Sequence, residues 1–182
     1  TAKTHSVNFD HLVKEKKFET VEDAIAYEFG YFVEYARDLV IINGDSELIN
    51  KQLERTKAKT VSIQKENNLK SYAATKDGTV FEINNLKFKF KYILPEEVYY
   101  SIVMCKTSVE YLNLPFDDLY SKFQMPPGRG SIFQGIKDIT IIDSSYNLSP
   151  GSLKAMLEIY NKLSAKNKWV VVGDMLELGI SE

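Results

Sequence analysis

The chain has 182 residues, of which 44% are hydrophobic and 26% charged, so it can bury the core of one domain or of parts of two. Its formal net charge of -2 shows no excess of Lys and Arg, which argues against nucleic acid or an anionic membrane as partner. No apolar run is long enough to cross a bilayer. The single cysteine, Cys105, is expected to be a small core residue and excludes an intramolecular disulfide, so we expect a cytoplasmic protein.

The N-terminal part of the chain predicts alternating helices and strands. Residues 20–38 place apolar side chains at helical spacing, with Thr20 as the N-cap. A short apolar strand over residues 38–45, a helix over residues 46–56 and a strand over residues 60–63 follow. This alternation predicts a parallel α/β sheet.

The pattern changes to an antiparallel hairpin between about residues 71 and 92. Asn84 and Asn85 form the expected turn, after which apolar residues alternate with three lysines. Lysines on the exposed side of a strand discourage edge pairing, and we favour that role over an anion-binding face. Helices are predicted over residues 96–112 and 117–123.

A Pro-Pro and Gly-Arg-Gly segment then marks a domain boundary, which divides the chain into residues 1–126 and 127–182. Beyond it we expect a strand ending at Asp143, a helix over residues 150–165 and a strand ending at Asp174. A strand, helix and strand of this length predict a right-handed parallel crossover. Asp143 and Asp174 would then lie together at the edge of the sheet where ligands bind.

Three motifs in this order resemble the Mur ligase family, in particular its members that add D-alanyl-D-alanine to a UDP-muramoyl tripeptide. They are Pro127-Gly128-Arg129, the loop DSSYNLSP from Asp143 to Pro150, and GDMLELG from Gly173 to Gly179. Any one of these motifs alone would be a weak signal, whereas their shared order is a strong one. The resemblance implies part of a central parallel-sheet ATPase-type domain with an antiparallel hairpin, followed by the start of a Rossmann-like C-terminal domain.

The N-terminal segment resembles the family more loosely. The order of THSVNFDHL, a helix and IINGDS implies that His11 is the family's metal-binding histidine. The family's carbamylated lysine is absent from AIAYEFGYF, where Glu28 or Phe29 takes its place depending on a one-residue shift, and Glu28 would supply a carboxylate instead. A structural histidine and a solvated glutamate are the alternatives at these two positions.

The resemblance also implies ATP-driven amide formation through an acyl phosphate, with magnesium neutralising the phosphate oxygens. Arg129 would supply a fixed cation that grips phosphate at two points. Asp143, Tyr146 and Asn147 would contact the ribose and base of ATP. Asp143 and Asn147 would otherwise serve only to turn the loop after a strand. The implied partners are a UDP-muramoyl peptide and an amino acid or dipeptide, and we expect a monomer.

Several positions depart from the family pattern. No Gly-x-x-x-x-Gly-Lys-Ser/Thr loop is present, so we expect a fragment of a longer enzyme, inactive by itself. Ser144 replaces a loop aspartate, and LPEEVYYSIV replaces the expected Gly-x-His-Asn-x-x-Asn segment. Two alternatives therefore stay open: another ligase of the superfamily, of folylpolyglutamate or cyanophycin type, or a catalytically inactive Mur-like binding protein.

Overall fold

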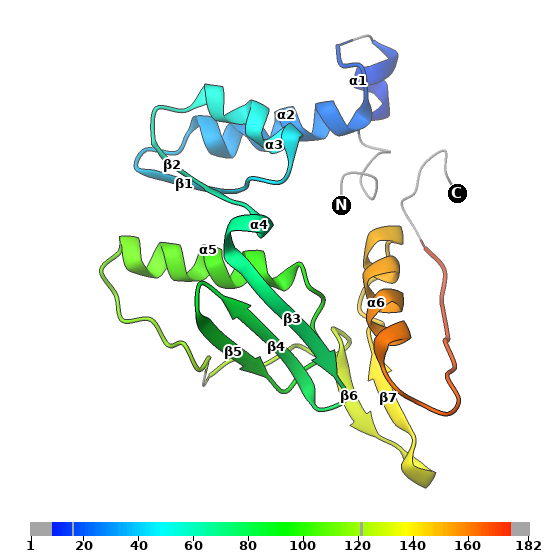
Figure 1. The fold of residues 1–182 in the computed structure, drawn as a ribbon. Helices are drawn as coiled ribbons and strands as arrows, with labels where there is room; N and C mark the ends of the chain where they lie inside the picture. Colours follow the sequence, from blue (N-terminus) through cyan, green and yellow to red (C-terminus); the bar gives the residue numbers. More distant parts are fainter. Residues whose placement is uncertain (1–8, 16, 121, 176–182) are drawn as a thin grey trace. The chain divides into compact units, whose positions relative to one another are not determined.

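A computed structural model of the chain describes residues 9–15, 17–120 and 122–175 (Figure 1). By its internal contacts the chain divides into two units. The first contains the described residues up to Asn67 together with Met175, and the second runs from Asn68 to Asp174. The domain boundary expected between residues 126 and 127 stays a prediction.

Helix α2 (Val21–Glu34) is the main helix of the first unit, and it begins where the sequence predicted. The hydroxyl oxygen of Thr20 accepts a hydrogen bond from the backbone N–H of Asp23 at 3.1 Å. This bond satisfies one of the four N–H groups that have no partner at a helix start. The predicted helix and its cap are therefore confirmed.

Strands β1 (Leu39–Asn43) and β2 (Lys59–Ile63) form a parallel pair, as expected for an α/β alternation. Helix α3 (Glu47–Lys51) and the 3-10 helix η2 (Gln52–Arg55) connect the two strands. Apolar side chains from α2, β1 and the connection pack together as a small core. Its members are Val33, Ala36, Val40, Ile42, Ile49, Leu53 and Ala58.

The second unit contains an antiparallel sheet of β3 (Leu69–Thr75), β4 (Gly78–Ile83) and β5 (Leu86–Phe90), in that order. The predicted hairpin of β4 and β5 is confirmed. Asn84 and Asn85 turn it with φ values of 47° and 68°, a left-handed conformation that asparagine tolerates and that tight hairpins need. Strand β3 was not predicted.

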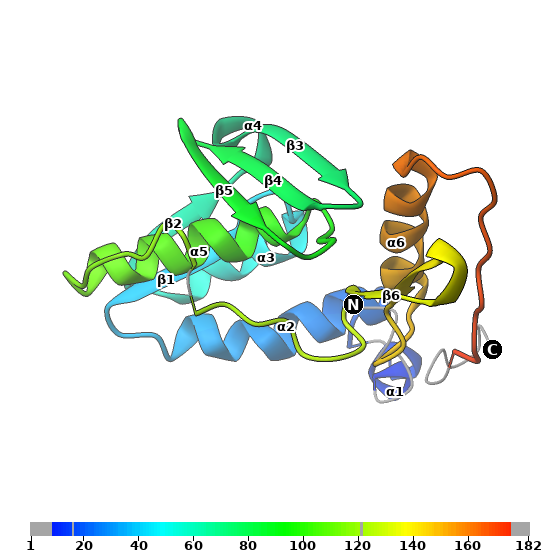
Figure 2. The ribbon, with the colours of Figure 1, turned by 90° about the horizontal axis from the view of Figure 1, so that it is seen from below.

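Helix α5 (Val98–Tyr111) lies along one face of this sheet in both views (Figures 1 and 2). Phe81 and Phe88 of the sheet are buried on that side, whereas Lys87 and Lys89 are exposed. The exposed lysines match their predicted role on the wet side of the strand. The expectation that Cys105 is a core residue is wrong. The buried residues of α5 include Ile102 and Val103, whereas the Cys105 side chain is exposed.

Thr79 is a polar residue inside the core of the second unit, with 1% of its surface exposed. Its hydroxyl donates to the Tyr92 carbonyl at 2.9 Å and accepts from the Leu94 N–H at 2.9 Å. Because Thr79→Val keeps the shape and leaves both groups unpaired, we expect it to lower the free energy of unfolding by about 1–3 kcal/mol. Urea denaturation measures this loss. Exposed Thr140→Val is the control, and an equal effect of both variants would contradict the prediction.

Strands β6 (Ser131–Gln134) and β7 (Thr140–Asp143) form an antiparallel hairpin, with Ser131 opposite Asp143. The 3-10 helix η3 (Ile136–Asp138) lies at its tip. Helix α6 (Pro150–Lys162) follows β7 and begins at a capping box formed by Ser149 and Ser152. The predicted strand and helix are confirmed, including Pro150 in the first helical turn.

The predicted parallel crossover is wrong, because residues 168–174 do not form a strand. Within the part of the chain that the structure describes, β7 pairs only with β6, and Val171 is 99% exposed. The segment is instead tied to the end of α6. Lys168 Nζ donates to the Tyr160 carbonyl at 3.0 Å, and the Tyr160 hydroxyl donates to the Trp169 carbonyl at 2.7 Å. Asp143 and Asp174 therefore do not end neighbouring strands.

The helix predicted over residues 117–123 is also absent from its described residues. Tyr120 has a φ of 47°, which a right-handed helix excludes. Its ring packs instead at 5.3 Å from Phe90 and 6.0 Å from Phe88, between centroids. Among the described residues of the chain, no helix combines the length and apolar character needed to span a membrane.

Candidate functional site

The hairpin of β6 and β7 brings the turn before β6 beside the loop after β7. The Gly130 N–H donates to the Asp143 carbonyl at 2.8 Å, and the Tyr146 N–H donates to the Gly128 carbonyl at 3.1 Å. Antiparallel pairing joins the start of one strand to the end of the next, so these segments meet at one end of the hairpin. Arg129 on the turn and Asp143, Tyr146 and the adjoining Asn147 on the loop are thus gathered in one place.

Two glycines let the turn that carries Arg129 approach its neighbours closely, Gly128 toward the loop after β7 and Gly130 toward Ile93. Gly128 has a φ of +75°, and a Cβ there would lie 3.0 Å from the Tyr146 backbone nitrogen. Gly130 has a φ of +77°, and its Cβ would lie 2.6 Å from the Ile93 carbonyl oxygen. Both the left-handed conformation and the lack of space favour glycine at these positions. The Gly-Arg-Gly sequence therefore has a structural reason that is independent of any ligand.

The guanidinium of Arg129 lies over the ring of Tyr146, with its central carbon 4.1 Å from the ring centroid. Both side chains are exposed. No carboxylate among the described residues forms an ion pair with Arg129. Its charge is therefore available to an anion, and a guanidinium binds phosphate or carboxylate through two parallel N–H groups.

The polar side chains of the loop after β7 bond to their own backbone. An Asp143 carboxylate oxygen accepts from the Ser145 N–H at 3.0 Å, and the Asn147 side-chain oxygen accepts from the Leu148 N–H at 2.9 Å. The hydroxyl and backbone N–H of Ser145 lower the pKa of Asp143, which keeps its carboxylate charged at neutral pH. The loop-turning role expected as an alternative is thus observed. The nucleotide contacts of Asp143, Tyr146 and Asn147 stay predictions.

A cavity of about 420 Å³ lies next to the turn that carries Arg129. Pro127 and Ser131, on either side of that turn, both line it, together with Lys91 and Phe133 among others. Its volume is in the range of small-molecule sites, and its wall combines a cation with aromatic and apolar side chains. The turn therefore borders a concave surface of the same unit.

The expected metal ligands do not by themselves form a magnesium site. His11 lies on the short helix α1 (Asp10–Lys14), Glu28 lies on α2, and both are exposed. In the described parts of the chain, no three His, Cys, Asp or Glu side chains are grouped to hold a metal ion. Magnesium also prefers oxygen ligands over imidazole. The roles of His11 and Glu28 stay predictions, and residues 1–8 lie outside the described part of the chain.

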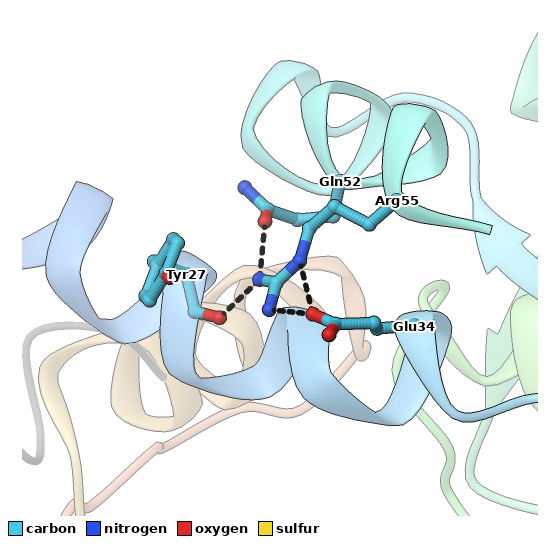
Figure 3. Close-up of polar contacts among 4 residues, drawn as sticks. All are labelled: Tyr27, Glu34, Gln52 and Arg55. Atoms are coloured by element: carbon cyan, nitrogen blue, oxygen red, sulfur yellow. Dashed lines mark hydrogen bonds and ion pairs between the residues drawn. The ribbon is translucent and has the colours of Figure 1, made fainter.

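Sequence reasoning missed a charged cluster that is built around Arg55 (Figure 3). Its guanidinium donates to the Tyr27 carbonyl at 2.6 Å, to the Gln52 side-chain oxygen at 3.1 Å and to Glu34 Oε2 at 2.5 and 3.1 Å. Gly30 in the middle of α2 was an available signal, because a helix tolerates glycine poorly unless something approaches closely. A Cβ there would lie 2.2 Å from Arg55 Nη1. This arginine is fully engaged within the fold.

Comparison with known proteins gives a local similarity in sequence and a similarity in fold. No family model matches the chain. It is 46% identical over 52 residues to the UDP-N-acetylmuramoyl-tripeptide--D-alanyl-D-alanine ligase of Rickettsia prowazekii, a match covering 29% of the chain and 11% of that protein. The structure resembles the MurF ligase of Thermotoga maritima in complex with ADP, with a TM-score of 0.66 and 24% identity over 81% of the chain and 36% of the ligase.

Two further solved structures share the fold. For MurF of Acinetobacter baumannii the TM-score is 0.75 at 16% identity, over 88% of the chain and 37% of that protein. For the UDP-N-acetylmuramate-alanine ligase MurC of Thermotoga maritima it is 0.54 at 16% identity, over 84% and 37%.

The chain thus spans little more than a third of the length of these solved ligases. At these identities the structural similarity is evidence for the fold alone. It confirms the predicted α/β class with a parallel pair and antiparallel strands. The resemblance found in the sequence is therefore confirmed: the chain has the fold of Mur ligases, and a segment of 52 residues is similar in sequence to a UDP-N-acetylmuramoyl-tripeptide--D-alanyl-D-alanine ligase.

Proposed function

We propose that this chain forms part of an ATP-dependent, ADP-forming ligase of peptidoglycan precursor synthesis. The ligase would join an amino acid or dipeptide, D-alanyl-D-alanine by the local sequence match, to a UDP-muramoyl peptide. The observation that carries the proposal is the guanidinium of Arg129, which forms no ion pair with the described residues and lies beside the Asp143 to Asn147 loop in a chain with the Mur ligase fold. The ADP bound to the Thermotoga maritima ligase supports a nucleotide substrate.

The proposed reaction has two steps. A substrate carboxylate attacks the γ-phosphorus of ATP, so that an acyl phosphate forms and ADP leaves. The amine of the incoming amino acid or dipeptide then attacks the acyl carbon, loses a proton and displaces inorganic phosphate, which leaves an amide. The transferred phosphoryl group carries negative charge throughout, so a fixed cation next to it lowers the barrier. Magnesium would neutralise further phosphate oxygens when bound.

Each residue of the hairpin end has a proposed part in this reaction. Arg129 binds the phosphate oxygens through two N–H groups. Asp143 keeps acceptor capacity beyond its bond to Ser145, because an ionised carboxylate accepts about four hydrogen bonds, and it would accept from a ribose hydroxyl. Asn147 would offer its amide group to the nucleotide. A cytoplasmic, monomeric enzyme is part of the same proposal.

The complete product of the gene that encodes this chain tests the proposal. We expect release of inorganic phosphate from ATP and magnesium only when UDP-muramoyl tripeptide and D-alanyl-D-alanine are both present, with the joined product seen by mass spectrometry. Omission of either substrate is the control. Replacing the pair with a folate and glutamate, or with an aspartate peptide and arginine, tests the other ligase types. No release with any pair, while ADP still binds, would favour an inactive binding protein.

A further inference from the structure

We propose that Tyr146 positions Arg129 through the face of its ring, instead of contacting the nucleotide through its hydroxyl. The inference rests on the proposed function only in that Arg129 acts on a phosphate. The ring centroid lies 4.1 Å from the guanidinium carbon, well inside the roughly 6 Å limit of an attractive cation–π contact. No hydrogen bond joins the Tyr146 hydroxyl to any described residue, so the ring is the part that is engaged.

Backbone hydrogen bonds hold the Arg129 turn and the Tyr146 loop next to each other. The Tyr146 N–H bonds to the Gly128 carbonyl at 3.1 Å, and the lack of a Cβ on Gly128 lets the two backbones approach. The Gly130 N–H bonds to the Asp143 carbonyl at 2.8 Å on the other side of Arg129. Backbone hydrogen bonds between turn and loop therefore hold the main chain at or next to Arg129 and Tyr146. Only the two side chains are left to move.

An exposed arginine without a partner would otherwise occupy many rotamers. Fixing such a side chain costs conformational entropy, which weakens the binding of its ligand. A ring under the guanidinium restricts it beforehand, and stacking leaves the N–H groups at the guanidinium edge free. Preorganisation of this kind raises the rate because the cation is already aimed when the transition state forms.

The cluster at Arg55 shows the contrasting way to hold an arginine. Its carbon also lies over tyrosine rings, at 4.5 Å from Tyr27 and 4.7 Å from Tyr31, but its N–H groups are taken by Glu34 and other acceptors. That arginine cannot receive an anion without losing bonds. At Arg129 the ring is present and no carboxylate of the described residues pairs with the guanidinium, which leaves its N–H groups for a phosphate.

A double-mutant cycle tests the inference in the phosphate-release assay. We expect Tyr146→Leu to lower kcat about two- to fivefold, the factor that corresponds to a cation–π contact between exposed side chains. Tyr146→Phe should restore most of the loss, since it keeps the ring and removes only the hydroxyl. In the Arg129→Ala background, whose residual turnover is measured at high enzyme concentration, Tyr146→Leu should have no further effect. Exposed Tyr111→Leu on α5 is the matched control.

Three outcomes would overturn the inference. If Tyr146→Phe is as impaired as Tyr146→Leu, the hydroxyl contacts the substrate. If Tyr146→Leu raises the KM for ATP equally with and without Arg129, the ring stacks on the base instead. If Tyr111→Leu is equally impaired, the effect is not specific to the pair. A wild-type protein without substrate-dependent phosphate release would instead contradict the proposed function.

NMR spectroscopy tests the contact between the Arg129 guanidinium and the Tyr146 ring without an activity assay. The chain has three arginines, so Arg129→Lys assigns the Arg129 resonances by difference in NMR spectra. We expect its Hδ protons to be shifted upfield by the ring current of Tyr146, with the shift kept in Tyr146→Phe and lost in Tyr146→Leu. Unshifted protons in the wild type would refute the stacked arrangement in solution, whatever the enzyme does.

Discussion

Arg129→Ala is expected to reduce the turnover of the ligase reaction by about 100- to 1,000-fold, the usual loss when a group that stabilises transition-state charge is removed. The fold should remain intact because the side chain is exposed, contacts the ring of Tyr146 and forms no ion pair with the residues that the structure describes. We expect a change in unfolding free energy within about 0.5 kcal/mol, as for surface substitutions in general. Steady-state phosphate release and a thermal melt measure the two effects.

Two further variants define what Arg129 contributes. Arg129→Lys keeps the charge and loses the two-point grip, so its turnover should fall between those of the wild type and Arg129→Ala. Arg37→Ala removes another exposed arginine and should leave turnover unchanged. A fully active Arg129→Ala enzyme would refute the role of this residue and remove the main support for the hairpin end as a phosphate site.

Arg55→Ala is expected to lower the free energy of unfolding by about 2–3 kcal/mol. The change leaves the Tyr27 carbonyl, Glu34 and the Gln52 amide without the guanidinium that joins η2 to α2. Breaking a fully buried charge pair costs about 3–5 kcal/mol, and the expected value is smaller because the Glu34 side chain is 40% exposed. Urea denaturation, followed by circular dichroism, measures the loss.

Gly30 provides an internal check on this cluster. In an exposed helix interior, Gly→Ala stabilises by up to about 1 kcal/mol. Gly30→Ala should instead destabilise, because the new Cβ would lie 2.2 Å from Arg55 Nη1 and displace a guanidinium that several acceptors hold. With Arg55→Ala present, Gly30→Ala should become stabilising, because the Gln52 side-chain oxygen, 2.4 Å from the new Cβ, is then no longer held by Arg55 and can move away. The same sign in both backgrounds, or an Arg55→Ala loss no larger than that of Arg37→Ala, would contradict the prediction.

Elements with a strong local signal were predictable from the sequence. Helix α2 has its capping threonine, α6 has Ser149 and Pro150 at its start, and the hairpin of β4 and β5 has two asparagines at its turn. Each signal comes from residues close together in the chain, whose propensities act without the rest of the fold. The parallel pair of β1 and β2 was predictable from the alternation of strand, helix and strand along the chain.

Pairing between short strands was not predictable in the same way. Strand β3 has the sequence LKSYAAT and β6 has SIFQ, and neither alternates clearly between apolar and polar residues. Such strands are stabilised by the neighbour they bond to, which local propensity does not specify. Residues 168–174 show the converse. Their apolar character predicted a strand, and no described strand pairs with them.

The sequence by itself determined which chemical groups the hairpin end carries, namely an arginine between two glycines and a loop with an aspartate, a tyrosine and an asparagine. The order of these motifs also indicated the resemblance to Mur ligases, which the comparisons confirm. Only the tertiary structure decided that the guanidinium of Arg129 rests on Tyr146 and has no ion-pair partner among the described residues, while that of Arg55 is bonded on every side. The physical reason is that an arginine's availability depends on which acceptors the fold brings near it. The pairing of β6 with β7 and the packing of η2 on α2 set those neighbours.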